Sequence, residues 1–322
     1  MGIMRIITVS VIVSLLSACG GGSGGGGGGI PTQTALFRII NSCSYAIWVQ
    51  HTNDPSAINE TAKLETGGYV DYNIPNAGRA SDRFWAKKGC DANGENCEIG
   101  QSSNPCPAAN ATGCAPPVDS KLEATWGCLL STASQCAVNP SDATQRLTDT
   151  YFNTSAVDGY TLPYTVAVSG NTLSDTGQPC QNIDCSAMDL SKCPTDENLS
   201  QGQTGNYPQY ANEDLRVKVA GQDTVLGCYS PCKKLNYASN TGFNGEGLTP
   251  DTRDEVVMYC CPTPPISADA CRAGPVVNTQ YVAAVHNMCT GGVYAYAYDD
   301  ILGLHHCSAS TMITMTFGPN CP

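Results

Sequence analysis

The stretch TYFNTSAVDGYTLP, residues 150–163, decides the predicted fold. A run rich in β-branched and aromatic residues leads into Asp158-Gly159, a dipeptide that favours a tight turn. A second strand pattern follows over residues 164–168, and neither run contains a cysteine. The stretch therefore predicts a strand, a turn that presents a carboxylate, and a returning strand, held in place by cross-links elsewhere in the chain.

Composition narrows the class of protein. The chain has 322 residues with 16 Lys and Arg against 28 Asp and Glu, a net charge of −12. This length allows one large β domain or two ordinary domains with a real core. No basic stripe is present to displace counterions from phosphate, so nucleic acid is excluded as a partner. Only 14% of residues are charged, which is typical of a secreted β protein.

The N-terminus indicates export. Arg5 precedes an apolar run, residues 6–16, which is too short to span a bilayer as a helix and suits a signal-peptide core. The run ends in Leu16-Ser17-Ala18-Cys19, which resembles the cleavage box of bacterial lipoproteins. We therefore predict a lipoprotein signal peptide over residues 1–18 and lipidation of Cys19. An ordinary secretory signal with a chance cysteine is the alternative.

A tether should separate the lipid from the folded domain. Residues 19–34 are dominated by glycine, which makes a flexible linker. Gly20 follows Cys19, so no aspartate is present to retain a lipoprotein at the inner membrane. The resemblance to lipoproteins implies an anchor in the outer membrane or cell surface of a Gram-negative bacterium. The folded domain is expected over residues 35–322.

The cysteines predict disulfides. The chain has 19 cysteines, and removal of Cys19 leaves an even number in an oxidising compartment. A zinc site is disfavoured because no pair of Cys-x-x-Cys units exists and the adjacent Cys260 and Cys261 suit one tetrahedral metal poorly. Spacing alone leaves the connectivity open.

Three motifs resemble the thaumatin-like family. The opening stretch is similar to the family signature, although Asn153 stands where the family usually has Asp. The run Arg83-Phe84-Trp85-Ala86-Lys87-Lys88-Gly89-Cys90 and the cysteine spacing of residues 180–261 also match. The resemblance implies the disulfides Cys43–Cys321, Cys90–Cys97, Cys106–Cys114, Cys180–Cys307, Cys185–Cys289, Cys193–Cys228, Cys232–Cys260 and Cys261–Cys271. Cys128 and Cys136 remain, and we predict that they pair with each other.

The expected fold is all-β. The resemblance and the short strands separated by turns predict a flattened, thaumatin-like β-sandwich with a disulfide-rich loop lobe and an acidic cleft between them. Strands are expected over residues 36–40, 45–49, 67–72, 121–126, 164–168, 215–219 and 312–317. Residues 41–42 should close the first two strands into a hairpin, and residues 142–147 should form one or two helical turns. Asn278 should cap a helix that buries Tyr281, Val285 and Met288.

The resemblance also implies a ligand-binding cleft. An Arg, a Glu and three Asp line it in the family; the matching positions here are Arg83, Glu123, Asn153, Asp158 and either Asp299 or Asp300. Carboxylates accept hydrogen bonds from sugar hydroxyls, and aromatic rims can stack on sugar rings. The expected rims are Tyr151, Tyr160 and Tyr296. The simpler interpretations are that Arg83 only pairs with Asp158 and that Asp158 is only a turn residue.

Three functions compete. The first is binding of a β-1,3-glucan-like polysaccharide. The second is weak endo-β-1,3-glucanase activity with Glu123 as the acid and Asp158 as the base or nucleophile. Asn153 weakens this hypothesis, because loss of a neighbouring carboxylate gives Glu123 less reason to stay protonated. The third is a protein-binding or inhibitory module without a sugar site.

Cofactor chemistry is not expected. No phosphate-binding Gly-rich loop, nucleophile elbow or zinc-binding helix motif occurs in the sequence. His305-His306 should point apart on a strand rather than bind one metal. We therefore expect no cofactor or metal, a polysaccharide partner, a membrane contact through the lipid, and a monomer.

Overall fold

The computed structural model describes residues 37–52, 61–101, 118–169, 178–219, 221–237 and 242–322. The predicted signal peptide, Cys19, the tether and the Cys106–Cys114 disulfide lie outside these ranges. Within them, no helix is both long enough and apolar enough to cross a bilayer.

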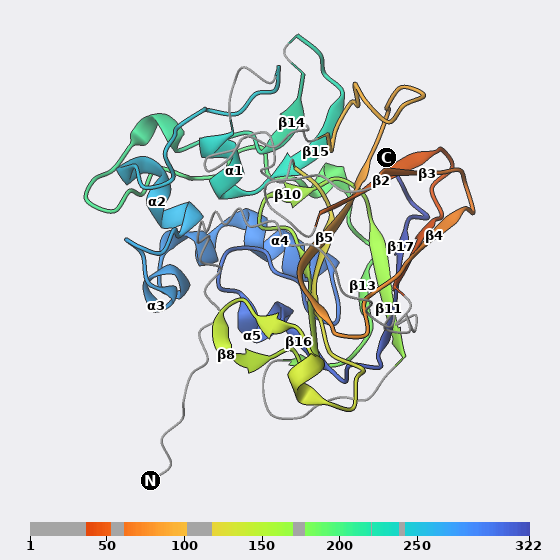
Figure 1. Ribbon diagram of the computed structural model, residues 1–322. Helices are drawn as coiled ribbons and strands as arrows, with labels where there is room; N and C mark the ends of the chain where they lie inside the picture. The colour runs from red at the N-terminus through yellow and green to blue at the C-terminus, as the bar shows by residue number, and fades with distance from the viewer. Residues whose placement is uncertain (1–36, 53–60, 102–117, 170–177, 220, 238–241) are drawn as a thin grey trace, which may run out of the picture.

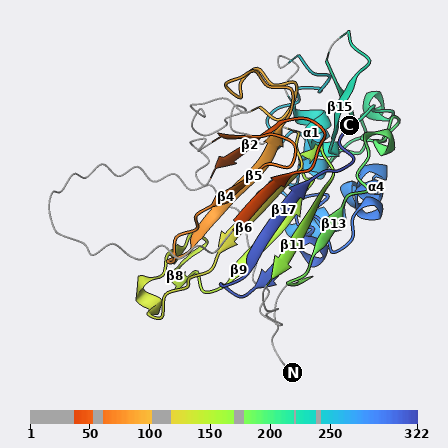
Figure 2. The same ribbon diagram turned by 90° about the vertical axis from the view of Figure 1, so that its right-hand side faces the viewer.

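Two β-sheets pack face to face and confirm the predicted sandwich (Figures 1 and 2). The larger sheet has, from edge to edge, the strands β12 (Gln178–Pro179), β16 (His305–Cys307), β9 (Thr150–Ser155), β6 (Lys121–Trp126), β5 (Arg79–Lys87), β2 (Ile47–Thr52) and β3 (Thr61–Leu64). The smaller sheet has β13 (Ile183–Cys185), β11 (Tyr164–Ser169), β17 (Met312–Phe317), β1 (Phe37–Asn41) and β4 (Tyr69–Tyr72).

Alternation along the strands explains why the sheets pack. In β6, Leu122 and Ala124 are buried whereas Glu123 and Thr125 are partly exposed, as the period of two requires. Phe37 of β1 reaches across the core, and its ring centroid lies 4.5 Å from that of Phe84 in β5. The apolar faces of the two sheets therefore meet, and the opposite face of the larger sheet carries the polar side chains.

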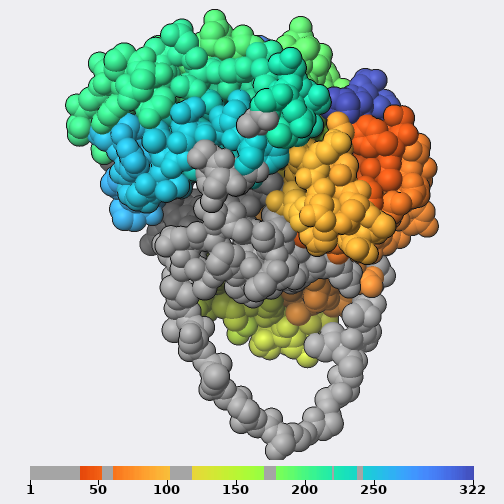
Figure 3. Space-filling view, turned by 90° about the horizontal axis from the view of Figure 1, so that it is seen from above, coloured from red at the N-terminus to blue at the C-terminus, as the bar shows by residue number. Residues whose placement is uncertain are grey.

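A lobe formed by residues 186–219, 221–237 and 242–289 lies beside the sandwich (Figure 1). Its helices are α1 (Pro231–Asn236), α2 (Asp254–Cys260), α3 (Ala268–Arg272) and α4 (Gln280–Met288), with 3₁₀ turns η2 (Leu190–Lys192), η3 (Pro208–Tyr210) and η5 (Pro275–Asn278). A small sheet joins it to the sandwich through β10 (Gly159–Tyr160), β15 (Val225–Tyr229) and β14 (Arg216–Lys218). Seen from above, the lobe lies on one side and the N-terminal strands on the other (Figure 3).

The disulfides organise the lobe and the chain ends. The pairs in the described residues are those that the resemblance implies, together with the Cys128–Cys136 pair. They are Cys43–Cys321, Cys90–Cys97, Cys128–Cys136, Cys180–Cys307, Cys185–Cys289, Cys193–Cys228, Cys232–Cys260 and Cys261–Cys271. Cys43–Cys321 closes the longest loop, so chain-entropy arguments give it the largest share of the disulfide stabilisation.

The expected first hairpin is wrong. β1 pairs with β4 and β17, whereas β2 pairs with β3 and β5 in the other sheet. Asn41 explains the crossing, because its side chain donates to the carbonyls of Tyr45 and Leu64 and accepts from the Cys43 amide. Those bonds hold a corner between sheets rather than a two-residue turn within one.

Two local predictions also need correction. Residues 142–147 are not helical: β8 (Asp142–Arg146) pairs with β7 (Val138–Asn139) after the short turn η1 (Ala133–Gln135). The helix capped near Asn278 is α4, but its cap is Thr279, whose hydroxyl accepts from the Val282 amide. The predicted buried face of α4 is correct, since Tyr281, Val285 and Met288 are all buried.

Candidate functional site

Three neighbouring strands place a row of polar side chains side by side on the outer face of the larger sheet. Arg83 on β5 lies opposite Glu123 on β6, and Glu123 lies opposite Asn153 on β9. The Arg83 Nε lies 2.9 Å from Glu123 Oε1, and Asn153 Nδ2 donates to Glu123 Oε2 at 3.1 Å. We call Arg83, Glu123 and Asn153 the polar row. Solvent reaches 32% of the Arg83 side chain and 29% of the Glu123 side chain.

Tyr294 extends the polar row on the side of β9. Its amide donates to Thr154, and the Ala156 amide donates to its carbonyl, so this segment runs parallel beside the end of β9. The Tyr294 hydroxyl donates to Asp300 Oδ1 at 2.5 Å, and Arg272 binds Asp300 Oδ2 at 2.8 Å. Burial, reinforced by Asp300 and Glu123, raises the pKa of Tyr294 far above its ordinary value, so the hydroxyl stays a donor.

The two consecutive aspartates have different surroundings. Asp300, in α5 (Asp300–Gly303), keeps 36% of its side chain exposed beside Tyr294. Asp299 is buried, and its Oδ2 contacts His286 Nε2 at 2.8 Å and accepts from the Ala295 amide at 3.0 Å. Asp300 is therefore the accessible member of the pair, and Asp299 holds α4 against the segment that carries Tyr294.

The turn that presents Asp158 is fixed from two sides. Gly159 has φ of +126°, and a Cβ there would lie 2.2 Å from the carbonyl of Cys228, so no other residue fits. Tyr281 of α4 donates its hydroxyl to the Ala156 carbonyl at 2.6 Å. The carboxylate thus sits where the sandwich meets the lobe.

Two lysines bind Asp158. Lys121 Nζ contacts Oδ2, and Lys233 Nζ of α1 lies 3.1 Å from Oδ1. Burial favours the neutral acid, but the two ammonium groups outweigh it and hold the pKa of Asp158 well below its usual range. The interpretation that Arg83 pairs with Asp158 is wrong, because Arg83 pairs with Glu123.

A further carboxylate lies beneath these lysines. Asp119 is fully buried, and its Oδ1 lies 3.3 Å from Lys121 Nζ. Burial raises the pKa of Asp119 to about 7, despite the opposing effect of Lys121. Lys121 is itself buried, and Asp119 and Asp158 outweigh this burial and raise its pKa. We call Asp119, Lys121, Asp158 and Lys233 the buried cluster.

Of the three tyrosines expected to border the cleft and stack on sugars, only Tyr151 is accessible. Tyr160 is 1% exposed and Tyr296 is 8% exposed, so both are packing residues rather than rims. Tyr151 is partly exposed on the face of the polar row, and its ring stacks on His306 with centroids 4.3 Å apart. Tyr151 and Tyr294 are therefore two partly exposed aromatic side chains next to the polar row.

The charges differ from the negatively charged cleft that the resemblance implies. Glu123 is next to Arg83, Asp158 is next to two lysines, and Asp300 is next to Arg272. Each carboxylate has its own cation, so the local charge is largely compensated. Such a surface offers donors and acceptors in alternation, which suits hydroxyl-rich neutral molecules more than cations.

Sequence reasoning missed Lys121, Asp119, Lys233 and Tyr294. The spacing of two residues in β6 places Lys121 on the face of Glu123, so strand periodicity could have found it. Lys233 has no such signal, because the disulfides of the lobe bring α1 to this position.

Comparisons with known proteins show the class. The model of the thaumatin family matches residues 41–319, so the chain belongs to the thaumatin family. "Glucan endo-1,3-beta-glucosidase" of Prunus avium is 25% identical over 283 residues, covering 87% of this chain and 88% of the relative. "Thaumatin-like protein 1" of Castanea sativa is 29% identical over 240 residues, covering 74% of this chain and 71% of the relative.

A solved structure adds only a distant likeness. The GH family 64 laminaripentaose-producing β-1,3-glucanase from Paenibacillus barengoltzii, complexed with laminarihexaose, has 11% identity and a TM-score of 0.42. The match covers 90% of this chain and 76% of that chain. The family assignment rests on the family model, which matches residues 41–319.

Proposed function

We propose that this chain is an exported, lipid-anchored protein that binds a β-1,3-glucan-like polysaccharide on the polar row. The observation that carries the proposal is the register of Arg83, Glu123 and Asn153 on adjacent strands, beside Tyr151 and Tyr294. A guanidinium, a carboxylate and an amide side by side can each bond a sugar hydroxyl, and the partly exposed Tyr151 ring can stack on a sugar face.

Binding without turnover fits the geometry better than hydrolysis. Glycoside hydrolysis needs one carboxyl group that donates a proton and another that attacks or activates water. Both oxygens of Asp158 contact lysines, and both oxygens of Glu123 accept from Arg83 and Asn153. The named activity of the Prunus avium relative makes hydrolysis the second outcome to test.

The anchor is proposed from the sequence. Leu16-Ser17-Ala18-Cys19 followed by a glycine-rich run supports lipidation at Cys19 and a flexible tether to the domain. We expect a monomer held at the outer membrane or cell surface. Cys19→Ser should move the protein from the membrane fraction to the soluble exported fraction; retention of the variant in the membrane would disprove this part.

Retention on insoluble β-1,3-glucan tests the binding site. Glu123→Gln and Arg83→Gln should each reduce the retained fraction at least several-fold, because each replaces a charged group that bonds a sugar hydroxyl with a neutral amide that bonds it more weakly. The matched controls are Arg38→Gln and Asp71→Asn, which break an ion pair of similar exposure, 33% and 32%, on the other sheet. The controls should bind like the wild type.

Two outcomes would overturn the proposal. Wild-type protein that is not retained on β-glucan would leave a protein-binding or inhibitory module as the better hypothesis. Release of reducing ends from laminarin by the wild type, lost in Glu123→Gln, would show that the polar row is catalytic.

A further inference from the structure

The polar row crosses the middle of β6, and a long ligand can leave it toward either end of this strand. Toward the start of β6, Lys121 is on the same face as Glu123, but its side chain is 1% exposed, and Asp119 before it is fully buried. Toward the end of β6, Thr125 is on that face and is partly exposed. The open direction for a longer ligand is therefore toward Thr125.

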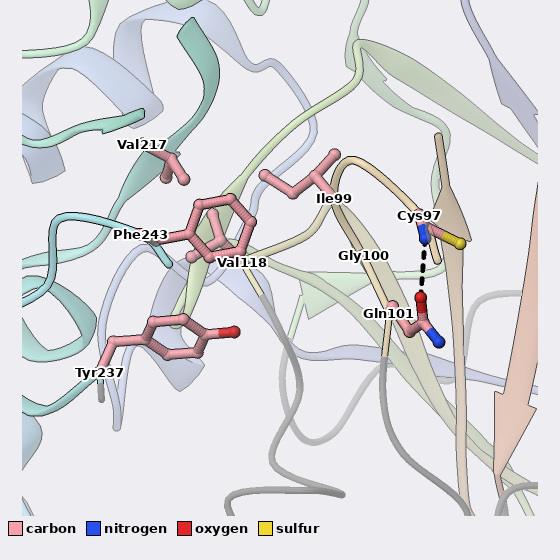
Figure 4. Close-up of a pocket in the computed structure, with 8 residues that line it drawn as sticks. All are labelled: Cys97, Ile99, Gly100, Gln101, Val118, Val217, Tyr237 and Phe243. Atoms are coloured by element: carbon pink, nitrogen blue, oxygen red, sulfur yellow. Dashed lines mark hydrogen bonds between the residues drawn. The ribbon is translucent and has the colours of Figure 1, made fainter. Parts of the chain in front are cut away.

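A pocket beyond the closed end of β6 does not offer another path. It lies between Ile99, Val118, Val217 and Phe243, and Tyr237 also lines it (Figure 4). Its volume of about 40 Å³ can hold water but is too small for a sugar ring. The pocket therefore does not extend the polar row.

A β-bulge flanks Thr125 on the side of β5. The register of β5 against β6 shifts between Arg79 and Asp82, so two residues of β5 stand opposite the single Thr125. The second of these two is Ser81, which is exposed and has φ of +64°. A residue with a Cβ rarely adopts this left-handed conformation, and such strained residues cluster at functional sites.

A buried carboxylate holds the bulge in place. Asp82 is fully buried; its Oδ2 accepts from Arg79 Nε at 2.8 Å and from Trp126 Nε1 at 2.6 Å, and its Oδ1 lies 3.3 Å from His51 Nε2. Arg79 and Trp126 pair directly across the two strands at the far side of the bulge. The chain thus commits a buried hydrogen-bond network to a bulge that brings Ser81 beside the polar row, and bulges next to binding sites re-aim a side chain.

Tyr151 flanks Thr125 on the side of β9. It lies opposite Thr125 on one side and opposite His306 of β16 on the other. The rings of Tyr151 and His306 stack with centroids 4.3 Å apart and 7° between their planes, and His306 Nε2 lies 3.3 Å from Asp149 Oδ2. His306 therefore covers one face of the Tyr151 ring, and the other face is directed toward the space above Thr125.

We propose that Ser81, Thr125 and Tyr151 form a further sugar subsite, the bulge subsite, for a glucan chain that continues from the polar row. The inference rests on the proposed function, because the polar row supplies the first contact. Thr125 lies about 7 Å along β6 from Glu123, so a later unit of the same chain reaches it.

The spacing of the strands suits a sugar ring at this position. Adjacent strands lie about 4.8 Å apart, so about 10 Å separates β9 from β5 across Thr125. A sugar ring that stacks on the open face of Tyr151 lies above the small Thr125 side chain. The Ser81 hydroxyl, on the opposite side of this space, can donate to or accept from a sugar hydroxyl.

Calorimetric titration with laminaritriose and laminarihexaose tests the bulge subsite. The wild type should bind the hexaose more tightly, because the longer chain occupies the polar row and the bulge subsite together. Tyr151→Ala should weaken hexaose binding about three- to ten-fold and laminaritriose binding less than about two-fold. The matched control is Tyr69→Ala, whose ring is 58% exposed on the other sheet and which should bind both oligomers like the wild type.

Ser81→Gly separates binding from folding. Glycine adopts φ of +64° without strain, so the variant should unfold at the same urea concentration as the wild type or at a higher one. It should nevertheless bind laminarihexaose about two- to ten-fold more weakly, because the hydroxyl is lost. Asn96→Gly is the matched control, since Asn96 is exposed, has φ of +52° and lies away from the polar row.

The outcomes separate this inference from the proposed function. If Tyr151→Ala and Ser81→Gly bind laminarihexaose like the wild type while Glu123→Gln binds it weakly, the bulge subsite is wrong and the polar row stands. Equal losses for the two oligomers in the bulge variants also overturn the subsite. If the bulge variants lose hexaose binding and Glu123→Gln does not, the bulge subsite stands and the polar row fails. Wild-type protein that binds neither oligomer overturns both.

Discussion

Glu123 and Lys121 lie two residues apart on one face of β6, yet the ion pairs that they make are of different kinds. The Glu123 side chain is 29% exposed and pairs with an equally accessible Arg83, whereas the Lys121 side chain is 1% exposed. Exposed pairs contribute little to stability, while breaking a buried pair leaves an uncompensated charge. The comparison indicates that the polar row is available to a ligand and that the buried cluster holds the structure together.

Removal of Lys121 should have the largest effect. Lys121→Met leaves Asp119 and Asp158 buried with Lys233 as their remaining cation, and should lower the free energy of unfolding by about 3–5 kcal/mol. Urea unfolding at pH 7 measures it. The control is Lys63→Met, whose partner Glu65 is 72% exposed and which should cost less than about 0.5 kcal/mol. Equal effects of the two variants would contradict the distinction between buried and exposed pairs.

This difference also explains what the sequence could predict. Glu123, Asn153 and Asp158 stand in motifs that resemble a known family, so their neighbourhood was predictable. The sequence did not predict that Asp158 pairs with lysines rather than with Arg83, because Lys233 reaches Asp158 only through the packing of α1. The burial of Tyr160 could not be predicted from the sequence either. Tyr160 follows the Asp158 turn, but it pairs with β15 and its ring packs on Tyr281 of α4.

The fold shows the same division. Local patterns predicted the buried face of α4 and a subset of the strands, namely β1, β2, β4, β6, β9, β11, β14 and β17. The corner at Asn41 was missed, because the choice between a hairpin and a crossing depends on carbonyls at Tyr45 and Leu64 that no local pattern reveals.

Titration of Asp119 should give the next largest effect. Its pKa is about 7 in the folded state against 3.8 for an ordinary Asp, so the folded chain holds the proton more tightly than the unfolded chain. The contribution of Asp119 to the free energy of unfolding therefore falls as pH rises from about 4 to about 7, and this contribution does not change further above pH 7. The loss should be on the order of 2–4 kcal/mol in the wild type relative to Asp119→Asn. Parallel stability curves for the two proteins between pH 4 and pH 7 would contradict the placement of Asp119.

A double-mutant cycle on the polar row should give a small coupling. Arg83→Gln and Glu123→Gln, alone and together, should yield a coupling free energy of about 0.2–1 kcal/mol that falls as salt is added. The same cycle on Arg38 and Asp71 provides the reference, since those side chains are exposed to a similar degree. A coupling of several kcal/mol for Arg83 and Glu123 would mean that the polar row is a structural element rather than an open binding surface.

Asn153→Asp should have the smallest effect on stability, and it tests directly whether the polar row differs in function from the buried cluster. The variant replaces a donor to Glu123 with a second carboxylate directly across the strand pair. Like charges in such positions cost about 0.2–1 kcal/mol, and the cost should nearly vanish at pH 4, where carboxyl groups take up protons. Unfolding at pH 7 and pH 4 measures this difference. Because Asp158 is still bound by Lys121 and Lys233, the variant should release no reducing ends from laminarin. Hydrolysis gained by this single change would show that Asn153 alone, and not the lysines on Asp158, separates binding from catalysis.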